Sequence, residues 1–152
     1  MQIIKDRELI ENSWIFISDE SALPMKPLDI TVSLNRWNTC QAELKKYSGK
    51  VGLRVNPDDD LNNLSLSTEQ PPLIEINFPV YTDGRGFSHT QRLRTQFKYT
   101  GEIRAVGQFM PDQFFYLARV GVNAFALEDK KLLQAGLTTL NDFSKSYQSS
   151  VN

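Results

Sequence analysis

The chain has 152 residues with a formal charge of −1, and 40% of them are apolar and 23% charged. This is the size of one domain with a substantial core, and the balanced charge excludes a basic excess that would draw the whole chain onto nucleic acid. A single cysteine excludes an internal disulfide, and no apolar run approaches the roughly 20 residues of a membrane helix, so the composition favours a cytoplasmic protein without a membrane partner.

The N-terminal segments Ile3–Ile4 and Trp14–Ile17 flank a polar turn and predict a small β-hairpin. Farther along, apolar segments predict five strands: Ile30–Leu34, Val51–Val55, Leu73–Phe78, Glu102–Val106 and Ala124–Leu127. Strand and helix alternate, which indicates βαβ units with right-handed crossovers. We therefore expect a single α/β domain over residues 1–152, with a mostly parallel sheet of about five strands that is either doubly wound or a partial barrel.

Capping residues predict where the helices between these strands begin. The predicted helix starts are Asn38 with Gln41, Asn56–Pro57 with the acids that follow, Ser88 with Gln91, and Pro111, whose helix Gly121 ends.

In parallel α/β sheets, ligands bind at the carboxyl ends of strands, and the loop before Ser88 is the richest of these here. Gly84 and Gly86 allow the backbone to approach a ligand, and Arg85 offers a planar fork of donors beside a helix start. The pattern predicts an anion site at Gly84–Ser88, to which Arg36 contributes from another strand end. The alternative is a capped loop in which Asp83 and Arg85 pair with each other or with the backbone.

Three charges occupy the middle of successive predicted strands: Arg54, Glu75 and Arg104. A charge on a covered sheet is costly unless it is paired, so we expect a charge network in which Glu75 bridges the two arginines. The alternatives are a purely structural ion pair and a face that is open to solvent.

One long segment, Phe78–Ser88, resembles the signature of an uncharacterised bacterial family, domain-of-unknown-function family 934. The resemblance continues through Gly101–Ala105 and includes Ser33–Trp37 upstream. Gln108 and Asn77 depart from this family pattern, which tends to have acids there. Family members are often described as oxidoreductases involved in sulfite reduction, and the resemblance implies a role in sulfur assimilation.

Two functions remain open at this stage. The first is an accessory or regulatory protein of sulfite reduction that binds a small anion or metabolite, and whose partner is sulfite reductase or another enzyme of sulfur assimilation. The second is a small enzyme in which Asp83 or Asp112 transfers protons, with Arg85 and Arg36 as electrostatic clamps. No motif indicates a metal or a cofactor, so none is expected.

Overall fold

The computed structural model describes residues 1–64, 66, 70–80 and 84–151. Its strands are β1 (Gln2–Lys5), β2 (Glu8–Glu11), β3 (Ile15–Phe16), β4 (Ile30–Ser33), β5 (Val51–Val55), β6 (Leu73–Phe78), β7 (Glu102–Gly107) and β8 (Ala124–Ala126). They form one sheet in the order β2-β1-β8-β7-β6-β5-β4-β3. Strands β3 to β8 run parallel to one another, whereas β1 is antiparallel to both β2 and β8.

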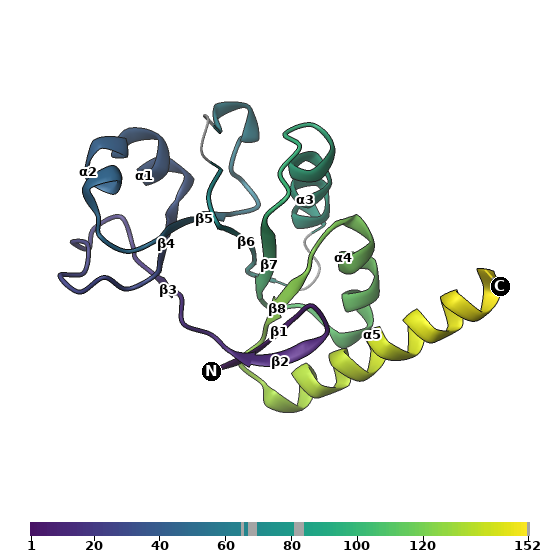
Figure 1. Ribbon diagram of the computed structural model, residues 1–152. Coiled ribbons are helices and arrows are strands. Elements are labelled where there is room, and N and C mark those ends of the chain that lie inside the picture. Colours follow the sequence, from purple (N-terminus) through teal and green to yellow (C-terminus); the bar gives the residue numbers. More distant parts are fainter. Residues whose placement is uncertain (65, 67–69, 81–83, 152) are drawn as a thin grey trace.

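The sheet curls into a half-barrel, and the helices lie on its convex side (Figure 1). The helices are α1 (Leu34–Thr39), α2 (Gln41–Lys46), α3 (Arg85–Thr95), α4 (Phe114–Val120) and α5 (Lys130–Val151), with 3₁₀ turns η1 (Leu61–Asn63) and η2 (Pro111–Gln113). Because consecutive parallel strands are also neighbours in the sheet, right-handed crossovers place every connection on the same side. Within the described residues, the opposite, concave side is therefore left without helices. Among the residues that the structure describes, no helix combines the length and apolarity needed to cross a membrane.

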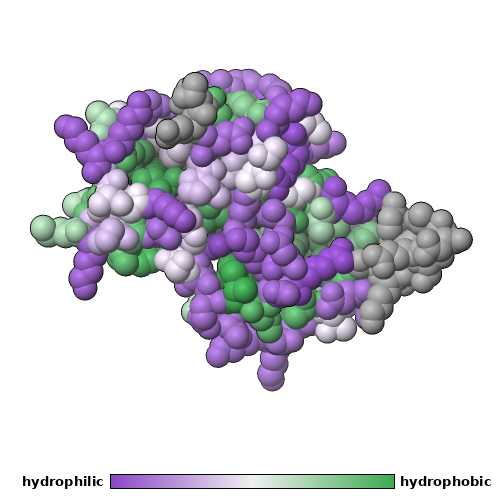
Figure 2. All heavy atoms as spheres, viewed as in Figure 1, coloured by the Kyte–Doolittle hydropathy of each residue, from purple (hydrophilic) through white to green (hydrophobic). Residues whose placement is uncertain are grey.

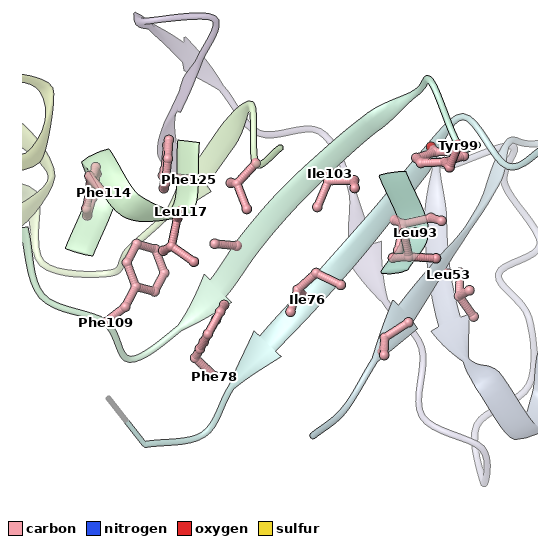
Figure 3. Close-up of a cluster of buried hydrophobic side chains, with 14 of the residues drawn as sticks. Leu53, Ile76, Phe78, Leu93, Tyr99, Ile103, Phe109, Phe114, Leu117 and Phe125 are labelled. Atoms are coloured by element: carbon pink, nitrogen blue, oxygen red, sulfur yellow. The ribbon is translucent and has the colours of Figure 1, made fainter. Parts of the chain in front are cut away.

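The main core lies between the convex side of the sheet and the helices. Ile76 and Phe78 of β6 and Ile103 of β7 point to that side, where Leu93 of α3 and Leu117 of α4 cover them (Figure 3). Alternate residues of a strand face opposite sides. The charged residues that alternate with these apolar ones therefore face the concave side.

The five predicted strands are present and parallel. The expected number of about five strands is wrong, because the sheet is mixed and has eight. The hairpin is also differently built. Gln2–Lys5 pairs with Glu8–Glu11 through the two-residue turn Asp6–Arg7, and both turn residues have positive φ, as this tight hairpin type requires. The segment Ile15–Phe16 instead pairs in parallel with β4 at the opposite edge of the sheet.

Three of the predicted helix starts are wrong. Helix α1 begins earlier than Asn38, because Ser33 caps it by accepting a hydrogen bond from the backbone N–H of Arg36 at 3.1 Å. After β5 the chain makes a turn and the short η1, capped by Asp60, in place of a helix at Asn56–Pro57. Helix α3 begins at Arg85, so Ser88 lies inside its first turn. The helix at Pro111 begins as the 3₁₀ turn η2, continues as α4 and ends at Gly121, as predicted.

Candidate ligand cavity on the concave face

A cavity of about 620 Å³ lies on the concave face, at the carboxyl ends of the parallel strands. The link from β2 to β3 runs across the open side of the half-barrel (Figure 1), and Asn12 and Trp14 of this link line the cavity. In the same view, Figure 2 shows apolar side chains in a hollow where β1 and β8 lie, bordered by hydrophilic ones. The polar wall of the cavity comes from the sheet and from the loops after β7 and β8. It consists of Arg54, Glu75, Asn77, Gln108, Glu128 and Asp129.

Arg54 and Glu75 form the centre of this polar wall. They are neighbours in register on β5 and β6, and Nε of Arg54 donates to Oε1 of Glu75 at 3.0 Å. The same oxygen accepts a 2.6 Å hydrogen bond from the hydroxyl of Thr31 on β4. Glu75 is only 4% exposed, so its charge is stabilised mainly by these two donors.

The guanidinium plane of Arg54 is held from its other side by an aromatic ring. Its Cζ lies 4.1 Å from the centroid of Phe16, the second residue of β3, which is a cation–π contact. Stacking and the Nε bond together fix both the position and the tilt of the guanidinium. Within the described part of the chain, neither Nη atom of Arg54 makes a hydrogen bond, although the side chain is 23% exposed and lines the cavity.

The second carboxylate oxygen of Glu75 is also available. No described residue donates to Oε2, and the one fully buried side-chain polar atom left without a partner among these residues is Oδ1 of Asn38. Oε2 is therefore not sealed in the core, and its small exposure lies toward the cavity that Glu75 lines. The pair consequently presents a fork of donors beside an acceptor.

The remaining walls are mixed in character. Asn77 donates to Oδ1 of Asn56 at 2.9 Å, and its position on β6 places it one alternation beyond Glu75. Asp129 uses Oδ1 to cap α5, accepting from the backbone N–H groups of Lys131 and Leu132. The apolar walls come from β7 and β8, from the start of α5, and from β3 with the residue before it. They consist of Trp14, Phe16, Val106, Ala126 and Leu132.

Arg104 is the neighbour of Glu75 in register on β7, but its guanidinium belongs to a separate network. Its Nε donates to Oε2 of Glu102 at 2.9 Å, its Nη2 forms an ion pair with the same oxygen at 2.6 Å, and its Nη1 donates to Oδ1 of Asn12 at 2.7 Å. Lys5 adds a 3.1 Å contact to Oε1 of Glu102. The expected bridge through Glu75 thus forms with Arg54, whereas Arg104 takes Glu102 as its acid. Arg104 anchors Asn12, the first residue of the link that covers the cavity.

The predicted anion loop at Gly84–Ser88 is separate from this cavity. Gly86 serves packing, because a Cβ atom there would lie 2.4 Å from the Phe78 ring. Gly84 has open space around it, and Arg85 and Ser88 are exposed on the first turn of α3. Asp83 lies outside the described residues.

The other predicted site residues occupy different positions. Arg36 is buried, and its Nη1 donates to the backbone oxygens of Ser18 at 2.8 Å and Ser21 at 2.7 Å, while Nη2 donates to Glu43 at 3.0 Å. Its guanidinium thus holds the loop before β4 in place. Asp112 is exposed in η2 and does not line the concave cavity.

One carboxylate at the carboxyl end of β5 has a perturbed acidity. Burial raises the pKa of Asp59 above its usual value of 3.8, and the nearby charge of Asp58 raises it further. The backbone N–H of Asn56, which donates to Oδ2 at 2.7 Å, and the charge of His89 act in the opposite direction. His89 itself contacts the backbone oxygen of Pro57 at 3.0 Å.

A second cavity, of about 350 Å³, lies by α2 and the amino ends of β5 and β6, where Trp37, Lys45 and Tyr47 contribute to its walls. Strand carboxyl ends are where parallel sheets bind ligands, and amino ends are not. The concave cavity also holds the prearranged charged pair, so it is the better candidate.

Sequence reasoning identified Arg54 and Glu75 but missed the aromatic half of the site. Trp14 and Phe16 were assigned to a hairpin, which concealed that they cross the open side of the sheet. For the other walls a positional signal was available: Glu128 follows directly after the predicted strand Ala124–Leu127, and Gln108 follows Glu102–Val106 after Gly107. Both Asn77 and Gln108, where the sequence departs from the pattern it resembles, lie on the cavity wall.

The sequence profile of a family described as bacterial proteins of unknown function, DUF934, matches residues 52–152, which is more than half of the chain. No curated protein matches the chain. The family description gives no activity, so the role in sulfite reduction that the resemblance implies stays a prediction. The chain belongs to the DUF934 family of bacterial proteins of unknown function.

Proposed function

We propose that this chain binds a small polar metabolite carrying an anionic group in its concave cavity, and that it acts as an accessory or regulatory protein. The observation that carries this proposal is the Arg54 guanidinium, which is held in place by Glu75 and Phe16 while its two Nη atoms make no hydrogen bond with described residues. A prearranged guanidinium fork beside a cavity suits a planar oxyanion, because little freedom is lost when the ligand binds.

The size and lining of the cavity support a metabolite rather than a single inorganic ion. A volume of about 620 Å³ falls in the range typical of small-molecule sites. Aromatic and aliphatic walls from Trp14, Val106 and Ala126 offer apolar contact to the rest of such a ligand. The biological setting that we propose is cytoplasmic sulfite reduction, with sulfite reductase or another enzyme of sulfur assimilation as the protein partner.

The test is a ligand-observed NMR screen of the protein against mixtures of carboxylic acids, amino acids, sugar phosphates and nucleotides. Gln108 is exposed at the cavity rim, so Gln108→Trp should fill the cavity without disturbing the core. Gln91→Trp is the matched control, because Gln91 is exposed on α3 and does not line the cavity. We expect saturation transfer to at least one compound, lost in Gln108→Trp and kept in Gln91→Trp. Absence of binding by every class would refute the proposal.

An enzyme at the helix start of α3 remains the second candidate. The exposure of Arg85 at the first turn of an 11-residue helix favours an anion site there, since the positive end of the helix dipole adds to its charge. Proton transfer in this version falls to Asp83 or Asp112. Arg36 is a weak clamp for it, because three hydrogen bonds already hold its guanidinium.

A further inference from the structure

We propose that the ligand of the concave cavity is a free α-amino acid, whose carboxylate binds Arg54 and whose α-ammonium binds Glu75. This inference rests on the proposed function and specifies its ligand class. It follows from two adjacent side chains, of which Arg54 offers hydrogen-bond donors and Glu75 an acceptor.

The donor half of the site is the outer edge of the Arg54 guanidinium. Nε is committed to Glu75, and the flat face is committed to Phe16, so the two Nη groups form the edge that remains. Parallel N–H bonds from this edge match the two oxygens of a carboxylate. Lysine in the same place would offer a point charge without that fork.

The acceptor half is Oε2 of Glu75. The other oxygen of the same carboxylate, Oε1, lies 3.0 Å from Nε of Arg54. Oε2 therefore belongs to a group that directly adjoins the guanidinium. In an α-amino acid the ammonium nitrogen is attached to the carbon next to the carboxylate. The carboxylate and the ammonium of the ligand are therefore close neighbours, as are the Arg54 guanidinium and the Glu75 carboxylate that would bind them.

The charge of the cavity selects an ammonium over a second anionic group. Among the described residues its lining includes three carboxylates, Glu75, Glu128 and Asp129, against the guanidinium of Arg54. Met1 also lines it, but its terminal ammonium is paired with Glu11 at 3.3 Å. A dianion such as sulfate or phosphate would add negative charge to a wall that is already negative. A zwitterion adds none, and its ammonium gains from each acid nearby.

The experiment measures binding of each standard L-amino acid by calorimetry and by saturation-transfer NMR. For every amino acid that binds, two matched analogues are tested: the carboxylic acid without the α-amino group, and the amide without the carboxylate. L-Alanine is thus compared with propionate and L-alaninamide. We expect millimolar or tighter binding of at least one amino acid and about ten- to a hundredfold weaker binding of both analogues, the usual scale of a lost charge-assisted bond.

Two variants separate the halves of the site. Arg54→Lys should weaken the amino acid and its deaminated analogue alike, since both use the fork. Glu75→Gln should weaken the amino acid about tenfold or more, because the ammonium loses its charged acceptor. The deaminated analogue should be nearly unchanged, because the glutamine oxygen can still accept from Nε of Arg54 and keep the guanidinium in place. Both variants are checked for folding by circular dichroism. If either fails to fold, Gln108→Trp, which leaves both residues in place, must abolish amino-acid binding.

The outcomes distinguish this inference from the proposed function. Binding of another compound class, lost in Gln108→Trp, with no amino acid bound, overturns the inference and leaves the proposed function standing. Equal binding of propionate and L-alanine, or of any other bound amino acid and its deaminated analogue, also overturns it, because the ammonium then contributes nothing. If no compound of any class binds, both fail.

Discussion

Arg54 and Glu75, neighbours in register on β5 and β6, join Nε to Oε1 at 3.0 Å on a sheet face that no helix covers. The Arg54 side of the pair is covered instead by Phe16 of the edge strand β3, which the chain reaches by crossing from the other edge of the half-barrel. A charged pair therefore sits on the floor of a cavity and not in a close-packed core. In this position the pair both stabilises the sheet and can contact a ligand in the cavity.

Replacing Glu75 by alanine should destabilise the fold. The substitution leaves Arg54 without its acid and the buried Thr31 hydroxyl without its acceptor. We expect the free energy of unfolding to fall by about 2–4 kcal/mol, measured by urea denaturation. Glu8→Ala, at an exposed position of β2, is the control and should change it by less than about 0.5 kcal/mol. A loss below about 1 kcal/mol for Glu75→Ala would show that the pair is not needed for folding.

Replacement by alanine should be costly at Gly86 in the first turn of α3 and nearly neutral at Gly84, which precedes it. At Gly86 a Cβ would lie 2.4 Å from the Phe78 ring, so Gly86→Ala must push α3 away from β6. We expect a loss of about 1–3 kcal/mol in unfolding free energy. Gly84 has φ of −80° and nothing within 4 Å of such an atom, so Gly84→Ala should stay within about 0.5 kcal/mol. Equal effects in chemical denaturation would contradict the packing role of Gly86.

The anion site at the start of α3 is tested by Arg85→Ala. Loss of a charge-assisted bond should weaken binding of sulfite, sulfate or phosphate by about 1.5–3 kcal/mol in calorimetry. The melting temperature should barely move, because Arg85 is exposed. Failure of the wild-type protein to bind any of these anions at millimolar concentration would remove this site, and unfolding of Arg85→Ala would make Arg85 a structural residue.

Asp59 should make stability depend on pH. Its pKa is raised in the folded protein, mainly by burial, so the folded state binds this proton more tightly than the unfolded state. The carboxylate therefore destabilises the fold at neutral pH, and this cost disappears as pH falls through the folded pKa toward the usual value of 3.8. Asp59→Asn keeps an acceptor for the Asn56 N–H and removes the charge.

The expected result is that Asp59→Asn is more stable than the wild type at neutral pH, and that this advantage shrinks toward about pH 4. Urea denaturation at several pH values measures it. Asp142→Asn, at an exposed position of α5, is the control and should show no such trend. An advantage for Asp59→Asn that grows as pH falls would contradict the sign of the shift.

The sequence by itself determined the five parallel strands and their alternation with helices. Runs such as Leu73–Phe78 bury alternate residues against the convex core, and that local period can be recognised without knowing the partner strand. It also identified Arg54 and Glu75, since charges in the middle of such strands are conspicuous. The exact helix starts were harder, because Asn38, Asn56 and Ser88 have capping chemistry that the tertiary structure does not use at those positions.

Only the tertiary structure decided which edges of the sheet the N-terminal segments join. Gln2–Lys5 pairs with β8, more than 100 residues away, and Ile15–Phe16 pairs with β4 at the opposite edge. Short strands of two to four residues carry too little periodicity to select a partner, and their partners lie far along the chain, so the pairing depends on surfaces that only the folded sheet presents. Because the link between these two strands covers the concave face, the cavity and the contact between Phe16 and Arg54 exist only in the assembled fold.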